Sequence, residues 1–109
     1  MKLNIYEKKQ VVKTYEADAY DLMFGTVEDV ADAVKLDDLQ TGSDAEIIKM
    51  VGNLVLSSMG TVKNLLKDIF DGLTDEELKK TKVNEIARVL IEVVKFTIIQ
   101  LNAGSNGKN

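Results

Sequence analysis

The sequence contains no cysteine, no histidine, no proline and no tryptophan among its 109 residues. The absence of cysteine excludes disulfides and thiolate metal sites, and the absence of histidine removes the commonest general base and transition-metal ligand. No Gly-x-x-x-x-Gly-Lys phosphate loop occurs, and the serines have no histidine to activate them. These absences predict a protein that is not an enzyme and that holds no metal and no cofactor.

Membrane and targeting signals are also missing from the sequence. The N-terminus, MKLNIYEKK, lacks the apolar run of a signal peptide. The most apolar stretch is interrupted by Arg88, Glu92 and Lys95, whereas a membrane-spanning helix needs about 18 apolar residues with few or no charges. We therefore expect a cytoplasmic protein with no membrane contact.

Charge is unevenly distributed along the chain, whose net charge is −4. Residues 1–15 carry four lysines against one glutamate, whereas residues 16–46 carry ten acidic residues against one lysine. Clustered lysine and arginine supply most of the affinity for phosphates, so this acidic chain is not expected to bind nucleic acid. The acidic segment is interpreted as a solvated face, with a cation site and a docking surface for a basic partner as alternatives.

The stretch of residues 81–101 contains no glycine and is too long for a strand. A surface helix needs an apolar stripe only about 100° wide, but on a helical wheel this stretch is apolar almost all round. Its polar residues fall in one narrow wedge made of Asn84, Glu85, Arg88, Glu92 and Lys95. Such a helix must be covered on both flanks by its own chain, by copies of itself or by a partner.

The whole pattern predicts a mainly α fold, a small helical bundle of three long amphipathic helices plus one short helix, with an N-terminal β-hairpin. Alternation and β-branched residues place the hairpin at 2–16, with a loop of about four residues. The helices are expected at about 18–36, 44–71, 75–80 and 82–102, in a single domain 1–102 that precedes a flexible tail 103–109.

Capping residues indicate where the helices begin. The expected caps are Ser43 with Glu46, Thr74 with Glu77, and Thr81. Within the first helix, Gly25 leaves two interpretations open. The unbroken apolar phase favours a single helix, and the alternative is a break with Thr26 capping a second helix.

Leu56 lies on the polar side of the predicted helix 44–71, with Gly52 and Gly60 each four residues away. Glycine inside a helix costs about 1 kcal/mol relative to alanine, so this pair indicates a notch where another helix approaches closely. The alternative is that the short helix or the hairpin covers Leu56 within one chain.

The last helix adds further candidates for a protein-binding surface. Ile99 falls inside the polar wedge, which indicates either fraying at the helix end or an intermolecular contact. Apolar residues on both edges of the helix exceed what a single helix–helix contact needs, and exposed apolar surface usually marks an interaction site. The candidate protein-binding residues are therefore Gly52, Leu56, Gly60, Val89, Ile91, Phe96, Ile98 and Ile99.

Three stretches of the chain resemble a known family. They are KLNIYEKKQVVKTYEAD at residues 2–18, YDLMFGTVEDV at residues 20–30 and LLKDIFDGLTDEELKKTKVNEIARV at residues 65–89. They are similar to the tail assembly chaperones of siphophages and prophages of Gram-positive bacteria, and the similarity covers most of residues 2–100. No short motif of that family assigns a binding role to an individual residue.

The resemblance implies a factor that acts in the host cytoplasm during phage morphogenesis and is absent from the mature virion. Such chaperones coat the long helical tape measure protein while tail tube subunits polymerise around it. A longer frameshifted form commonly recruits the tail tube protein, and self-association into a homo-oligomer is expected. The alternatives are a structural head–tail connector or other small virion protein, and a nucleic-acid regulator using Lys49, Lys63 and Lys67.

Overall fold

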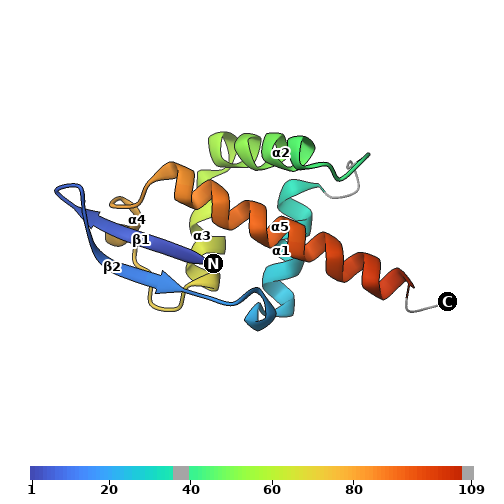
Figure 1. The fold of residues 1–109 in the computed structure, drawn as a ribbon, viewed down its shortest axis with the longest axis horizontal. Coiled ribbons are helices and arrows are strands. Elements are labelled where there is room, and N and C mark those ends of the chain that lie inside the picture. Colours follow the sequence, from blue (N-terminus) through green and yellow to red (C-terminus); the bar gives the residue numbers. More distant parts are fainter. Residues whose placement is uncertain (36–39, 107–109) are drawn as a thin grey trace.

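The computed structural model describes the backbone of residues 1–35 and 40–106, and the side chains of these residues as far as residue 100. The predictions of a mainly helical chain and of an N-terminal antiparallel hairpin are confirmed. The elements in chain order are β1 (Lys2–Glu7), β2 (Gln10–Glu16), the 3-10 helix η1 (Ala19–Asp21), α1 (Phe24–Val34), α2 (Asp44–Ser57), α3 (Met59–Ile69), α4 (Asp75–Leu78) and α5 (Val83–Asn106). Figure 1 shows α5 crossing in front of α1 and α3, with the hairpin at one end of the long axis.

The core lies where α5 meets α1, α2 and β1. Residues of α5 at helical spacing form its buried face, and Thr97 within this face donates its hydroxyl to the carbonyl of Val93 at 2.8 Å. The largest fully buried side chains are those of Phe70, Leu3, Leu65, Leu66 and Leu90. The wide apolar arc of α5 is therefore covered largely by its own chain.

The hairpin is tighter than the sequence predicts. The strands reach Glu7 and Gln10, so the loop has two residues, Lys8 and Lys9, instead of about four. Both lysines have positive φ, 51° and 69°, as the central residues of a type I′ turn require. The pairing register shifts between Ile5 and Tyr6, which places a bulge in the strand that carries Val12.

The outer edge of β1 is fixed to the start of α5. The backbone N–H of Tyr6 donates to the carbonyl of Lys80 at 2.8 Å, and the N–H of Asn4 donates to the Glu85 carboxylate at 3.2 Å. The Tyr6 hydroxyl also donates to Glu85, which raises the pKa of Tyr6. These bonds orient the whole hairpin relative to the helices.

The predicted helix 18–36 is wrong in its continuity. Asp18 accepts a hydrogen bond from the N–H of Tyr20 at 3.0 Å and caps the short η1, after which Leu22 and Met23 are extended and α1 begins. The break therefore precedes Gly25, and Thr26 is buried inside α1 instead of capping it. At its other end α1 stops at Val34, and part of the remaining prediction lies outside the described residues.

The predicted helix 44–71 consists of two helices. The Ser57 hydroxyl donates to the carbonyl of Asn53 at 2.6 Å, a bond that bends helices, and Ser58 leaves the helical region with φ −141° and ψ 53°. The chain turns here because α2 packs on α5 while α3 also packs on α1. Gly52 and Gly60 therefore lie on different helices, α2 and α3.

Two of the three predicted helix starts have the expected cap. Thr74 and Glu77 form the predicted capping box of α4. Ser43 accepts from the N–H of Glu46, but the Glu46 carboxylate accepts from the backbone of residues 40–42 instead of from Ser43. Those bonds to backbone N–H groups lower the pKa of Glu46 to about 2.

The ends of α4 and α5 differ from the prediction. The α4 helix ends at Leu78, and the hydroxyl of Thr81 donates to the Leu78 carbonyl at 2.7 Å instead of capping the last helix. The α5 helix begins at Val83 and continues to Asn106, beyond the predicted end at 102. The predicted flexible tail thus starts as helix, and residues 107–109 lie outside the described residues.

Candidate protein-binding surfaces

The strongest candidate surface combines exposed aromatic side chains of η1, α1 and α5. Tyr20 is 81% exposed and Phe24 is 77% exposed. The Tyr20 ring meets the ring of half-buried Phe96 edge-on, with ring centroids 5.4 Å apart. Exposed Met23 lies beside Phe24 in the chain, and exposed Ile99 lies one turn beyond Phe96. We call these five residues the aromatic surface.

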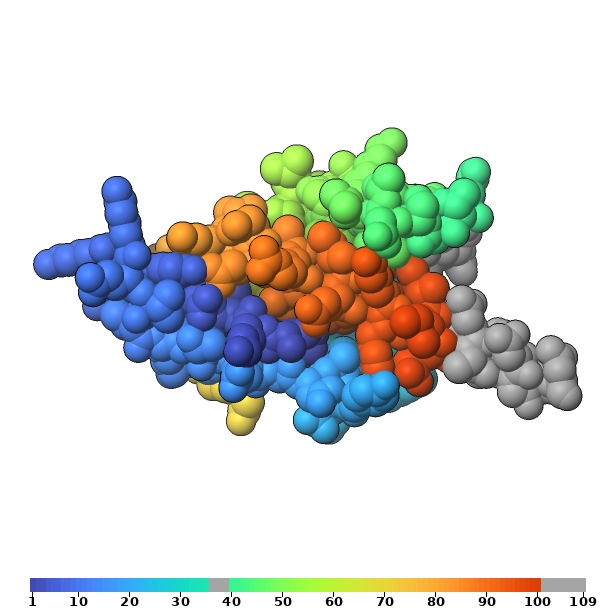
Figure 2. Space-filling model, in the orientation of Figure 1, coloured from blue at the N-terminus to red at the C-terminus, as the bar shows by residue number. Residues whose placement is uncertain are grey.

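The break between η1 and α1 contributes to this surface. In a continuous helix, Tyr20 and Met23 would lie toward the face that carries the buried residues of α1. Because Leu22 and Met23 are extended, these two side chains remain outside the core, and Phe24 is exposed in the first turn of α1 itself. The space-filling view shows the start of α1 lying against the C-terminal half of α5 (Figure 2).

A second, smaller surface lies at the turn between α2 and α3. Leu56 is 84% exposed and Met59 is also exposed, on the two sides of Ser58. Neither the hairpin nor the short helix covers Leu56, so that interpretation is wrong. Gly52 and Gly60 lie on different helices, and a Cβ added at either would meet nothing within 4 Å, so neither glycine marks a close approach within the chain. We call Leu56 and Met59 the junction surface.

The remaining predicted residues of α5 have different environments. Val89 is only 2% exposed and belongs to the core, so its prediction as a surface residue is wrong. Ile91 and Ile98 are half-buried against the core. Ile99 is 61% exposed, as its place in the polar wedge predicts, and it lies in a continuous helix instead of a frayed end.

Sequence reasoning missed the three exposed residues that precede and begin α1. The helical wheel places Tyr20, Met23 and Phe24 on the buried face of one helix. The only local signal against that placement is Asp18, a good N-cap two residues before Tyr20. The same wheel, continued through Ser58, places Met59 on the apolar face of a single helix 44–71, whereas Met59 is 63% exposed.

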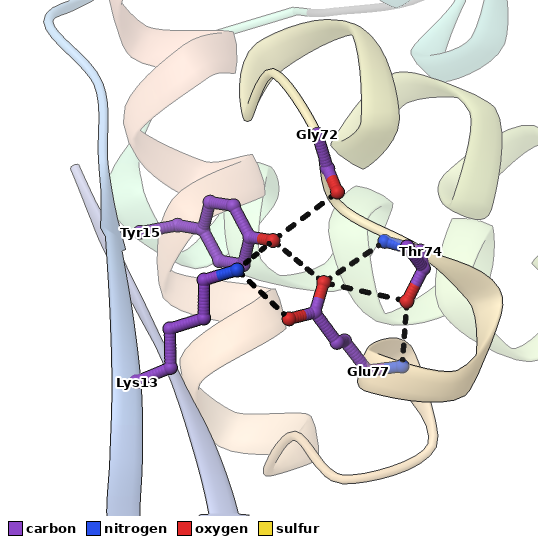
Figure 3. Close-up of polar contacts among 5 residues, drawn as sticks. All are labelled: Lys13, Tyr15, Gly72, Thr74 and Glu77. Atoms are coloured by element: carbon purple, nitrogen blue, oxygen red, sulfur yellow. Dashed lines mark hydrogen bonds and ion pairs between the residues drawn. The ribbon is translucent and has the colours of Figure 1, made fainter.

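A polar network joins β2 of the hairpin to α4 and to the turn before it (Figure 3). The Tyr15 hydroxyl donates to the Glu77 carboxylate at 2.6 Å, and Lys13 contacts the other carboxylate oxygen at 3.1 Å. Glu77 also accepts from Thr74, and its pKa falls to about 2, chiefly because of the bond from Tyr15. The Tyr15 hydroxyl also lies 3.2 Å from the carbonyl oxygen of Gly72, so the network anchors β2 to the turn that contains Gly72.

Within residues 1–35 and 40–100, no group of three or more acidic side chains is arranged to hold a metal ion. Asp29 and Asp32 of α1 instead line a shallow cleft of about 360 Å³ together with Asp68 of α3. No ion pair involves these three carboxylates among the described residues.

Comparisons of the chain with protein-family models, with curated proteins and with solved structures returned no match. Within the part of the chain that the structure describes, no helix combines the length and apolar character that crossing a bilayer requires. The surfaces described above are therefore the basis for assigning a function.

Proposed function

We propose that this protein is a phage tail assembly chaperone that binds the tape measure protein and keeps it soluble. The observation that carries the proposal is the aromatic surface, where Tyr20, Met23 and Phe24 are each at least 74% exposed. Exposed apolar groups in contiguous patches mark interaction sites. The resemblance of residues 2–30 and 65–89 to the tail assembly chaperones supports this choice of partner.

The aromatic surface suits a helical ligand. An amphipathic helix presents apolar side chains at positions i, i+3, i+4 and i+7, and it is bound where an apolar strip accepts that row. Tyr20 and Phe24 supply broad rings, and aromatic residues dominate the energetics of such interfaces. Asp18 and Asp21 beside them add a polar rim.

The remaining parts of the proposal follow from the resemblance. Several copies act on one tape measure protein in the host cytoplasm and leave before the virion is complete. A longer frameshifted form contributes the contact with the tail tube protein. The junction surface offers a second contact for the tape measure chain, at the turn between α2 and α3.

The test is co-expression with the tape measure protein, followed by a pull-down at moderate salt. The wild-type chain is expected to bring the tape measure protein into the soluble fraction and to co-purify with it in several copies. Phe24→Asp should reduce the recovered tape measure protein strongly. Ile48→Asp is the matched control, because Ile48 is also an exposed apolar residue but lies on α2.

Three results would contradict the proposal. The first is a tape measure protein that remains insoluble while this chain elutes alone. The second is equal loss of binding in the Phe24 and Ile48 variants, which would separate binding from the aromatic surface. The third is detection of the chain in purified particles by mass spectrometry, which would indicate a head–tail connector instead.

A further inference from the structure

We propose that copies of this chain associate head to tail, with the basic hairpin of one copy seated on the acidic cleft between α1 and α3 of the next. This inference rests on the proposed function only in expecting self-association. It names which two surfaces meet, and neither of them is the aromatic surface.

The hairpin is the basic and unpartnered member of the pair. Lys8 and Lys9 form its loop, and neither has an ion pair among the described residues. Behind the loop, β2 exposes half or more of Val11 and Val12, and it pairs only with β1. The hairpin thus presents apolar side chains beside uncompensated positive charge.

The cleft is the acidic member of the pair. Asp29 and Asp32 of α1 and Asp68 of α3 line it, whereas Leu54 and Leu65 at its base are only 6% and 2% exposed. Its volume of about 360 Å³ is at the small end of the range for binding pockets, which suits protruding side chains. The cleft therefore matches the hairpin by its charge.

The hairpin of one copy cannot occupy the cleft of the same copy. The hairpin is held at one end of a molecule 52 Å long by the bonds of Tyr6 to Lys80 and of Tyr15 to Glu77 (Figure 1). These bonds prevent it from reaching the cleft of its own chain. A contact between two different surfaces on identical copies is heterologous, and it generates open chains or closed rings.

The competing arrangement is a two-fold pair in which the β2 strands of two copies lie side by side. In such a two-fold pair the strands run antiparallel, so the two lysine loops lie at opposite ends of the pair. When the strands pair over their full length, Lys13 at the centre of one lies next to Lys13 of the other, and like charges on adjacent strands are destabilising. The bulge in the hairpin and the presence of Lys13 on β2 also disfavour strand addition at this edge. Charge therefore favours the cleft as the surface that receives the hairpin.

The test measures the mass of the purified full chain by light scattering over a range of concentrations and salt. The wild type should form concentration-dependent species that dissociate near 1 M salt, where the Debye length is about 3 Å. The double variant Lys8→Glu/Lys9→Glu should associate at least about tenfold more weakly, because like charges would face each other. Lys49→Glu/Lys63→Glu is the matched control, since it changes the net charge by the same amount but on α2 and α3 instead of in the hairpin loop.

A charge exchange gives the decisive result. Asp29→Lys/Asp32→Lys should also abolish association by itself, because its cleft would repel the basic hairpin. An equimolar mixture of this variant with Lys8→Glu/Lys9→Glu should associate again, since both hairpin–cleft contacts are then between opposite charges. Circular dichroism of each variant establishes that it is folded.

Three outcomes would overturn the inference: a wild type that is monomeric at every concentration, oligomers indifferent to the hairpin charges, and a mixture that fails to restore association. The pull-down with tape measure protein is read separately. A monomeric chain that still solubilises the tape measure protein would overturn the head-to-tail contact and leave the proposed function intact. A chain that self-associates as expected but no longer solubilises the tape measure protein would overturn the proposed function and leave the head-to-tail contact intact.

Discussion

The hairpin end of the molecule and the η1–α1 region use their aromatic residues in opposite ways. At the hairpin end, Phe70 is 1% exposed and packs near the ring of Tyr15, whose hydroxyl is bonded to Glu77. In the η1–α1 region, Tyr20 and Phe24 are exposed, and the Tyr20 ring meets Phe96 edge-on. The contrast separates aromatic residues that stabilise the fold from aromatic residues available to a partner.

The largest expected effect compares the two phenylalanines directly. Phe70→Ala should lower the free energy of unfolding by about 3–5 kcal/mol, because it leaves a cavity in the core. Phe24→Ala should change it by at most about 0.5 kcal/mol, because the side chain is already in water. Chemical denaturation of the two variants measures both values. Similar losses in the two variants would remove the distinction between the hairpin end and the η1–α1 region.

The next effect concerns Glu77, whose pKa falls from 4.5 to about 2 in the folded state. A lowered carboxyl pKa contributes stability that is complete above the unfolded value and is lost as the pH falls through the folded value. Glu77→Gln should therefore be less stable than wild type at pH 7, and this difference should shrink between pH 4.5 and 2. Denaturation curves across this pH range measure it.

Two variants test the assignment of that pH dependence. Tyr15→Phe should move the pKa of Glu77 back toward 4.5 in an NMR titration, because Tyr15 is the largest cause of the shift. Glu46 is the control carboxylate: its pKa is also about 2, but its partners lie in the loop before α2, so Tyr15→Phe should leave the pKa of Glu46 unchanged. A difference that stays constant down to pH 2 in Glu77→Gln would contradict the role given to Glu77.

The smallest effect distinguishes two glycines. Gly52→Ala should raise the free energy of unfolding by about 1 kcal/mol, because alanine is the better helix former and the added Cβ meets nothing within 4 Å. Gly72→Ala should lower it, because Gly72 has a φ of 87° in the turn after α3. Thermal unfolding of both variants gives the two signs. A destabilised Gly52→Ala would indicate a close approach at α2 that the structure does not show.

Local chemistry made part of this fold predictable. The capping box of Thr74 and Glu77 and the helical character of residues 82–102 depend on neighbours in sequence, and the sequence analysis found both. The exposure of Ile99 also followed from its place on the helical wheel, whereas the wheel left open whether another part of the chain covers Leu56. Each of these inferences needed only the period of one helix.

The breaks before Met23 and at Ser58 could not be predicted in the same way. The apolar period continues through both positions, whereas the separate helices pack on different partners: α1 contacts α5, α2 and α3, and α2 contacts α5. The exposure of Tyr20 and Met23 was missed for that reason. It depends on a break in the helix, whereas the wheel assumes an uninterrupted one.

The two-lysine loop of the hairpin has a consequence for protein engineering. Lys8 and Lys9 both adopt the left-handed conformation, which asparagine and glycine occupy at lower free energy. Replacing the pair by Asn-Gly should therefore make the isolated chain more stable while it removes the charge from the loop. A stability screen would select this change, and an assay of the proposed hairpin–cleft association would reject it. Under that proposal, optimising the monomer and preserving its association are opposing goals at this loop.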